Sequence, residues 1–159
     1  MKLKLAVLAL LVTSAFAAEP AKINLAIAGT AEELTALERI KVDYFFGTPE
    51  QKLAIVPMFD TDFHGIGEGP TGPSRSDYAQ STSNLKGPIF PVFPAGTFKM
   101  SDVHIVTLQP GCVVITYIAS GPGPDGKPWS AFLSSTWVKR GKEWKTVYYQ
   151  ETAIPAPKS

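Results

Sequence analysis

Cysteine is almost absent from this sequence, with Cys112 the single one among 159 residues. One thiol cannot form a disulfide within the chain, even in an oxidising compartment. Because Cys112 begins an apolar segment, we expect it to be a small, buried hydrophobic residue rather than a reactive thiol.

Histidine is nearly as scarce, and neither of the two residues has the spacing of a strong metal site. His64 and His104 lack the i, i+4 arrangement and the added cysteines of zinc-binding motifs. The glycine-rich stretch Gly65-x-Gly67-x-Gly69 follows no strand of a βαβ unit, so it does not match a dinucleotide-binding fingerprint. We therefore expect neither a metal nor a cofactor.

The sequence also lacks a large excess of charge and a long hydrophobic run. Its 15 basic and 14 acidic residues nearly cancel, which argues against nucleic acid or an anionic membrane as the main partner. The apolar run 5–12 is too short for a comfortable membrane span. It follows Lys2 and Lys4 and precedes Ala15-Phe16-Ala17, a pattern typical of a secretory signal peptide. We expect residues 1–18 to be removed and residues 19–159 to form one periplasmic or secreted domain, with its core at about 31–154.

The first half of that domain contains helix signals. Thr30 and Glu33 have the spacing of a capping box, and apolar residues follow at helical spacing, namely Leu34, Leu37, Ile40 and Tyr44. This pattern predicts a helix whose other faces hold Glu38 and Lys41, ended by Gly47. A second start signal, Thr48 followed by Pro49, predicts a short helix to about Met58.

The rest of the chain favours strands. Alternation over 59–66 predicts a strand, the glycines and prolines of 65–73 predict a loop, and the polar residues 74–77 can begin a third helix that reaches Asn84. Four strands are then predicted at 98–108, 112–120, 129–140 and 143–153, with a tight turn at Gly141. Helices first and strands afterwards indicate an α+β fold.

Several segments together resemble the NTF2-like superfamily. They are Glu33-Leu34-x-x-Leu37-Glu38-Arg39, Asp62-Phe63, Asp125-Gly126-Lys127-Pro128 and above all the strand–turn–strand block 135–145. Within the superfamily the chain is most similar to the SnoaL-like group of domains related to the calcium/calmodulin-kinase association domain. The resemblance implies a cone: a strongly bent antiparallel sheet wrapped around about three N-terminal helices, with a pocket at its open end. It also implies a homodimer that forms through the outer face of the sheet.

Strand parity, counted from the Gly141 turn, groups side chains by face: Ser134, Thr136 and Tyr149 share one face, and Trp137 and Tyr148 share the other. The likeness to the kinase association domains implies that the first group lies inside the cone, and we expect four inner residues to bind the ligand: Tyr117, Ser134, Thr136 and Tyr149. Trp137 and Tyr148 are expected on the outer face, where aromatic residues suit a dimer interface. In the kinase association domains, the positions that match Tyr117 and Thr136 carry arginines that line the cavity. Without those arginines, the pocket should be less suited to anions.

Asp62 and His64 alternate along one predicted strand and form the one evident acid/base pair in the sequence. A carboxylate beside an imidazole can orient it and raise its pKa, as proton abstraction requires. Three hypotheses follow. The protein binds a small, largely apolar molecule in its pocket; or it is a cofactor-free lyase or isomerase that uses His64 and Asp62; or it is a homodimeric interaction module with a vestigial pocket.

Overall fold

The computed structural model describes residues 31–69, 72–87, 92–123 and 125–155. The expected signal peptide and the Thr30 end of the expected capping box lie outside these residues. The described elements are, in chain order, α1 (Ala31–Phe45), α2 (Pro49–Ile55), η1 (Val56–Met58), β1 (Phe59–Gly69), β2 (Gly72–Asp77), α3 (Tyr78–Lys86), β3 (Lys99–Gln109), β4 (Cys112–Pro122), β5 (Pro128–Arg140) and β6 (Glu143–Ala153). The expected α+β class and the order of the helices and the four later strands are confirmed.

The six strands form one sheet in the order β2-β1-β6-β5-β4-β3. Strands β3 to β6 form an antiparallel meander, and β1 and β2 form an antiparallel hairpin. The two parts join where β1 pairs in parallel with β6, so the sheet is mixed rather than wholly antiparallel. A parallel pair needs a long connection, and here the whole chain between β1 and β6 supplies it.

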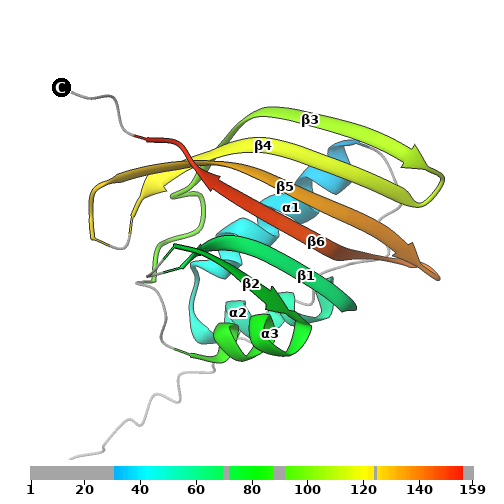
Figure 1. Ribbon diagram of the computed structural model, residues 1–159, viewed down its shortest axis with the longest axis horizontal. Coiled ribbons are helices and arrows are strands. Elements are labelled where there is room, and N and C mark those ends of the chain that lie inside the picture. Colours follow the sequence, from blue (N-terminus) through cyan, green and yellow to red (C-terminus); the bar gives the residue numbers. More distant parts are fainter. Residues whose placement is uncertain (1–30, 70–71, 88–91, 124, 156–159) are drawn as a thin grey trace, which may run out of the picture.

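The helices cover one face of the sheet. Helix α1 crosses behind β4, β5 and β6, while α2 and α3 lie beside β1 and β2 (Figure 1). The core between these layers consists mainly of aliphatic and aromatic side chains, including Leu34, Leu37, Ile55, Met58, Ile115, Tyr117, Leu133 and Trp137. None of the helices in the described residues has the length and apolar composition needed to cross a bilayer.

The start of α2 agrees with its sequence signal. The Thr48 side chain accepts a hydrogen bond from the Gln51 amide, and the Gln51 side chain accepts one from the Thr48 amide, so both halves of a capping box are present. Pro49 occupies the first turn, as predicted. This junction directs the chain from α1 back toward the sheet.

The loop predicted at 65–73 was wrong. Strand β1 continues through Gly69, and residues Gly72–Asp77 form β2. Glycine is disfavoured in strands because it has no side chain to pack, but the hydrogen-bonded hairpin outweighs that preference here. Helix α3 consequently begins at Tyr78, with the Asp77 carboxylate accepting a hydrogen bond from the Gln80 amide.

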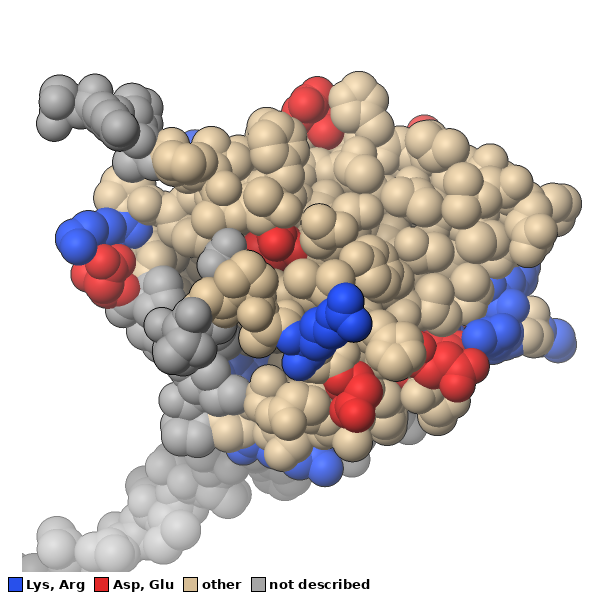
Figure 2. Space-filling view, viewed as in Figure 1, with Lys and Arg blue, Asp and Glu red and all other residues tan. Residues whose placement is uncertain are grey.

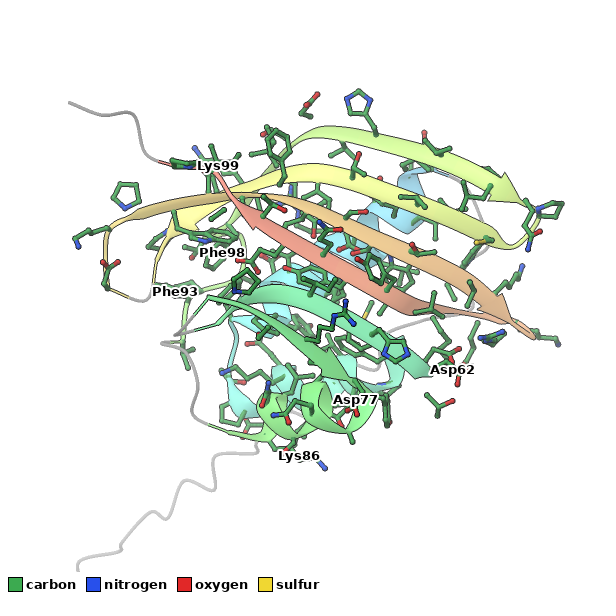
Figure 3. All side chains as sticks on the ribbon, in the orientation of Figure 1. Asp62, Asp77, Lys86, Phe93, Phe98 and Lys99 are labelled. Carbon is green, nitrogen blue, oxygen red and sulfur yellow. The ribbon has the colours of Figure 1, made fainter. Side chains whose placement is uncertain are left out.

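An aromatic cluster packs at one end of the sheet. Phe98 stacks on Phe46 with ring centroids 4.2 Å apart, and Phe93 and Trp129 meet Phe98 edge-on. Figure 3 shows Phe93 and Phe98 together at this end.

Candidate functional site

Helix α1 places two opposite charges in the interior. Glu38 is 0% exposed and Lys41 is 4% exposed, although both are ionisable. Their side chains form an ion pair, with 2.7 Å between Lys41 Nζ and Glu38 Oε1. Buried charges of this kind require a partner and further hydrogen bonds to offset the loss of water.

The sheet supplies those hydrogen bonds to Glu38. Oε1 accepts one from the Tyr117 hydroxyl at 2.7 Å and one from Ser135 Oγ at 3.0 Å, and Oε2 accepts one from the Trp137 indole N–H at 2.7 Å. Lys41 in turn donates to Ser135 Oγ at 2.7 Å. The carboxylate is therefore fixed by donors from β4, β5 and its own helix.

Lys41 connects this network to Tyr149 on β6. Its ammonium lies 5.0 Å from the centroid of the Tyr149 ring and 5.5 Å from that of Trp137, distances at which aromatic faces attract cations. Burial lowers the pKa of Lys41, while the Glu38 carboxylate opposes that shift.

The polar network extends from Tyr149 to Glu151, which lies beside Gly67 on β1. The Tyr149 hydroxyl donates to Glu151 Oε2 at 3.1 Å. The nearest atom that a Cβ added at Gly67 would meet is the same Oε2, at 3.9 Å. Gly67 and Glu151 are both partly exposed, so the inner face of β1 opens toward solvent here.

The two inward phenols are poor acids. Burial raises the pKa of Tyr149 well above its usual range, and the nearby Glu151 carboxylate adds to this effect. Burial likewise raises the pKa of Tyr117, with Glu38 next in importance. At neutral pH both hydroxyls therefore remain protonated hydrogen-bond donors.

Two of the four expected pocket residues lie on the inner face. Tyr117 is fully buried, and Tyr149 packs against the core from β6. The inner-face prediction was wrong for Ser134 and Thr136, which alternate with the buried Leu133, Ser135 and Trp137 and thus lie on the opposite face. Their proposed part in ligand binding has no support from this placement.

A β-bulge on β6 explains why Tyr149 lies inward although Ser134 and Thr136 do not; the face of β5 itself was taken from the resemblance, and the structure has the opposite face inside. Trp137 pairs with Thr146, but Thr136 pairs with Tyr148, so β6 has one extra residue at Val147. Parity counted from the turn therefore changes at the bulge, and Tyr149 lies opposite Ser135 rather than Ser134. The expected outward position of Trp137 was also wrong, because its side chain is 0% exposed; Tyr148 does lie on the outer face.

Asp62 and His64 are both exposed on β1. The polar interactions of these two residues do not join them: Asp62 lies 3.7 Å from Arg140, and His64 lines a surface depression that also includes Arg75 and Tyr148. Figure 3 shows Asp62 at the edge of the molecule. Across the described residues, no three histidine, cysteine, aspartate or glutamate side chains cluster in a way that could hold a metal ion.

Sequence reasoning missed Glu38, Lys41, Ser135, Glu151 and Gly67. For Glu38 and Lys41 the sequence did contain a signal. The buried stripe of α1 follows the spacing 34, 37, 38, 41 and 42, and two charged residues occupy it at positions where apolar ones are expected. Glu151 could not be found without knowledge of the bulge on β6, and Ser135 was missed because the resemblance assigned the opposite face of β5 to the pocket.

Comparisons with known proteins bear on the fold. No protein-family model matches the sequence, and no curated protein matches it. Among solved structures, an NTF2-like protein from Cytophaga hutchinsonii has a TM-score of 0.63 at 12% identity, over 80% of this chain and 100% of that chain. The chain has an NTF2-like fold.

Two further similar structures have names that refer to an association domain and a hub domain. A putative calcium/calmodulin dependent protein kinase II association domain from Xanthomonas campestris has a TM-score of 0.57 at 16% identity, over 86% of this chain and 96% of that one. A CamKII hub homology domain from Chlamydomonas reinhardtii has a TM-score of 0.58 at 16% identity, over 80% of this chain and 100% of that one. At these identities the likeness establishes the fold alone, which confirms the expected cone of helices and sheet.

Proposed function

We propose that this NTF2-like protein is exported and binds a small, largely apolar molecule against the inner face of β1, beside Tyr149. The observation that carries the proposal is Gly67. Glycine inside a strand weakens it, and often marks a place where a ligand or another backbone approaches closely.

Gly65, the neighbouring glycine on the same face of β1, shows what a glycine required by packing looks like. A Cβ at Gly65 would lie 2.9 Å from Ser76 Oγ and 3.3 Å from the Phe63 ring, so packing alone explains that glycine. At Gly67 the nearest atom is 3.9 Å away, which is an ordinary contact distance. Internal packing among the described residues therefore does not require glycine at position 67. A molecule bound over this position would require it, because a side chain would occupy the same space.

The surroundings of Gly67 fit a small-molecule site. Such sites are mostly apolar and contain a few polar groups that fix the orientation of the ligand. Tyr149 offers an aromatic ring and a hydroxyl, and Glu151 offers a carboxylate. The inward-facing Leu133 and the small residue Ala131 lie on the adjacent strand β5. This combination supports a ligand with a large apolar surface and one polar group.

A thermal-shift and native mass-spectrometry screen of lipophilic metabolites tests the proposal on the protein comprising residues 19–159. We expect a compound that raises the melting temperature of the wild type and of Thr152→Leu, a matched variant on the outer face of β6, but not of Gly67→Leu. Circular dichroism checks that both variants are folded. A screen without any stabilising compound, or unchanged binding by Gly67→Leu, contradicts the proposal.

A second candidate function, homodimeric interaction, is favoured by the outer face of the sheet. The outward residues of β4, and those of β5 as far as Val138, are uncharged, and Phe132, Val106 and Leu108 of this face are 53%, 55% and 62% exposed. In Figure 2 the region over β4 and β5 is tan, and charged atoms lie along its edges. An exposed apolar surface of this kind marks an interaction site, and a second copy of the chain presents the same surface.

Sedimentation velocity at micromolar concentration tests this interface. We expect the wild type and Ala79→Asp, a control on α3, to sediment as dimers, whereas Phe132→Asp shifts toward monomer because it places a charge on the apolar face. Monomeric wild type, or a dimer that Phe132→Asp leaves intact, contradicts it. The lyase or isomerase alternative has no comparable support, since it requires His64 and Asp62 to be hydrogen-bonded and to face a cavity.

A further inference from the structure

We propose that the outer face of the β1–β2 hairpin binds an organic oxyanion, a carboxylate or a phosphate ester, through Arg75 and His64. This site is separate from the one over Gly67, because side chains alternate along β1 and His64 lies on the face opposite to Gly67. The inference therefore goes beyond the proposed function and does not depend on it.

The register of the sheet brings the lining of this site together. His64 pairs with Tyr148 on β6, and Ile66 pairs with Arg75 on β2. These four residues line one surface depression of about 510 Å³, together with Gly65, Ser76 and Asp77. A volume of this size lies within the range of small-molecule sites.

Arg75 differs from the other two arginines of the chain. Arg39 donates to the Phe98 carbonyl at 2.8 Å, and Arg140 binds the Asp60 carboxylate at 2.6 Å. Arg75 is exposed in the depression, and within the part of the chain that the structure describes its guanidinium has no hydrogen bond or ion pair. A guanidinium presents a planar fork of donors that matches the paired oxygens of a carboxylate or a phosphate.

The two histidines show the same contrast. His104 Nε2 lies 2.9 Å from Asp102 Oδ1, whereas His64 makes no such contact with another described residue. An imidazole N–H can donate to a bound oxygen atom. The arginine and the histidine whose donors are not used by the described protein thus lie on adjacent strands and line the same depression.

Asp77 is the acidic residue on the described lining of the depression, and helix α3 already uses it. Its Oδ1 accepts a hydrogen bond from the Gln80 amide at 2.8 Å, and Figure 3 shows Asp77 where β2 meets α3. A negative charge at the start of a helix is stabilised there. Asp77 and Arg75 lie two residues apart on β2, yet no ion pair joins them in the described structure. The guanidinium therefore remains available for an oxygen atom from outside the protein.

Tyr148 and Ile66 favour an organic anion over a bare inorganic one. Both are partly buried, and the Tyr148 hydroxyl donates to Gln150 Oε1 at 3.2 Å, which leaves its ring as the surface that a ligand meets. Small-molecule sites combine such apolar surface with a few polar groups that fix the orientation of the ligand. The apolar part of the ligand can pack on these two side chains while its oxygens meet Arg75.

Three probes with the same ring and different charge test the inference: phenyl phosphate, benzoate and benzyl alcohol, titrated into the isotope-labelled protein at pH 7 and low salt and followed by NMR. We expect at least one of the two anions to bind about tenfold or more tightly than the alcohol, because hydrogen bonds between charged groups are the stronger ones. The amide signals of His64, Arg75 and Tyr148 should shift. The anion that binds more tightly distinguishes a phosphate site from a carboxylate site.

Arg75→Gln should remove most of that preference, and His64→Ala should remove part of it. Lys86→Gln is the matched control, because it removes one positive charge from the last turn of α3, outside the depression, and it should keep the preference. All three side chains are exposed, so we expect the variants to fold, and circular dichroism checks this.

Four outcomes overturn the site: no binding by either anion, equally tight binding of benzyl alcohol, a preference that survives unchanged in Arg75→Gln or His64→Ala, or an equal loss in Lys86→Gln. None of them bears on the site over Gly67, which the lipophilic screen tests by itself.

Discussion

The ion pair between Glu38 and Lys41 is held in place by the strands rather than by the helix that carries it. Each charge is compensated within the interior, and Tyr117, Ser135 and Trp137 all donate to the same carboxylate. A network of this kind gains little net free energy over apolar packing, but it tolerates only one arrangement of α1 on the sheet. It thereby fixes where Tyr149 lies.

Removing one charge of the Glu38–Lys41 pair should destabilise the fold far more than removing both. We expect Glu38→Leu or Lys41→Met alone to lower the free energy of unfolding by about 3–5 kcal/mol, because each leaves the other charge buried without its partner. The double variant should lose clearly less free energy of unfolding than the two single variants lose together. Urea denaturation of the four proteins measures this cycle, with Asp125→Asn, in the exposed pair with Lys127, as a control that changes little. Additive losses would contradict the network.

These residues also show what the sequence could not reveal. Leu34 and Leu37 were correctly assigned to the buried side of α1. Glu38 and Lys41 were assigned elsewhere, because charged residues are expected to be exposed unless they are paired. Their partners lie about 80 to 100 residues later on β4 and β5. No local pattern in α1 contains that information.

Strand β1 is the element in which the fold and the candidate site meet. Its two inner glycines have different surroundings, one crowded and one open. The alternation of apolar residues predicted the beginning of this strand, but the glycines that make it suitable for a ligand also made its end resemble a loop. The local preference of glycine therefore favoured a loop, whereas hydrogen bonding with β2 favoured a strand. The hydrogen-bonded hairpin forms in the structure.

Alanine substitutions should distinguish the two glycines. Gly65→Ala forces its methyl group against Ser76 Oγ, which lies 2.9 Å from the Cβ position, and we expect a loss of about 1–3 kcal/mol. Gly67→Ala should be neutral or slightly stabilising, because alanine restricts the unfolded chain and meets no close atom. Thermal and urea unfolding of both variants measure the difference. Equal destabilisation would mean that the space at Gly67 is not open.

The β-bulge on β6 limits how far the faces of this strand can be predicted from the sequence. Both strands and their turn were predicted correctly, and the pairs next to the turn, such as Lys139 with Trp144, have the expected register. One extra residue at Val147 then placed Tyr149 and Glu151 on the same face as Ser135 and Trp137, whereas uninterrupted parity would place Tyr149 with Ser134. Bulges have no dependable sequence signal, so the faces of a long hairpin can be derived from its turn only up to the first bulge.

For the molecule as a whole, the buried phenols set a limit on alkaline stability. The pKa of Tyr117 is raised above its usual value near 10, so above that pH the unfolded chain releases protons that the folded chain keeps. Stability is unaffected by this group below pH 10 and falls as the pH rises further, by up to about 1.4 kcal/mol per pH unit. Lys41, whose pKa is lowered, opposes the trend until the unfolded chain loses its own proton near pH 10.5.

Urea unfolding between pH 9 and 11.5 measures this dependence. We expect Tyr117→Phe to flatten the decline above pH 10, although it is less stable than the wild type at neutral pH because Glu38 loses one donor. Absorbance at 295 nm, which reports phenolate, should show that the late ionisation is lost with Tyr117. An unchanged slope in Tyr117→Phe would show that this phenol ionises in the folded protein as it does in water.

The parallel pairing of β1 with β6 has a consequence for biosynthesis. Strands β3, β4 and β5 can associate as soon as each leaves the ribosome, since neighbours in the sheet are neighbours in the chain. Strand β1 is made earlier than all of them, yet its place beside β6 does not exist until residues 143–153 have been translated. A nascent chain therefore has the buried side of β1, including Phe63, without its partner strand for most of its synthesis.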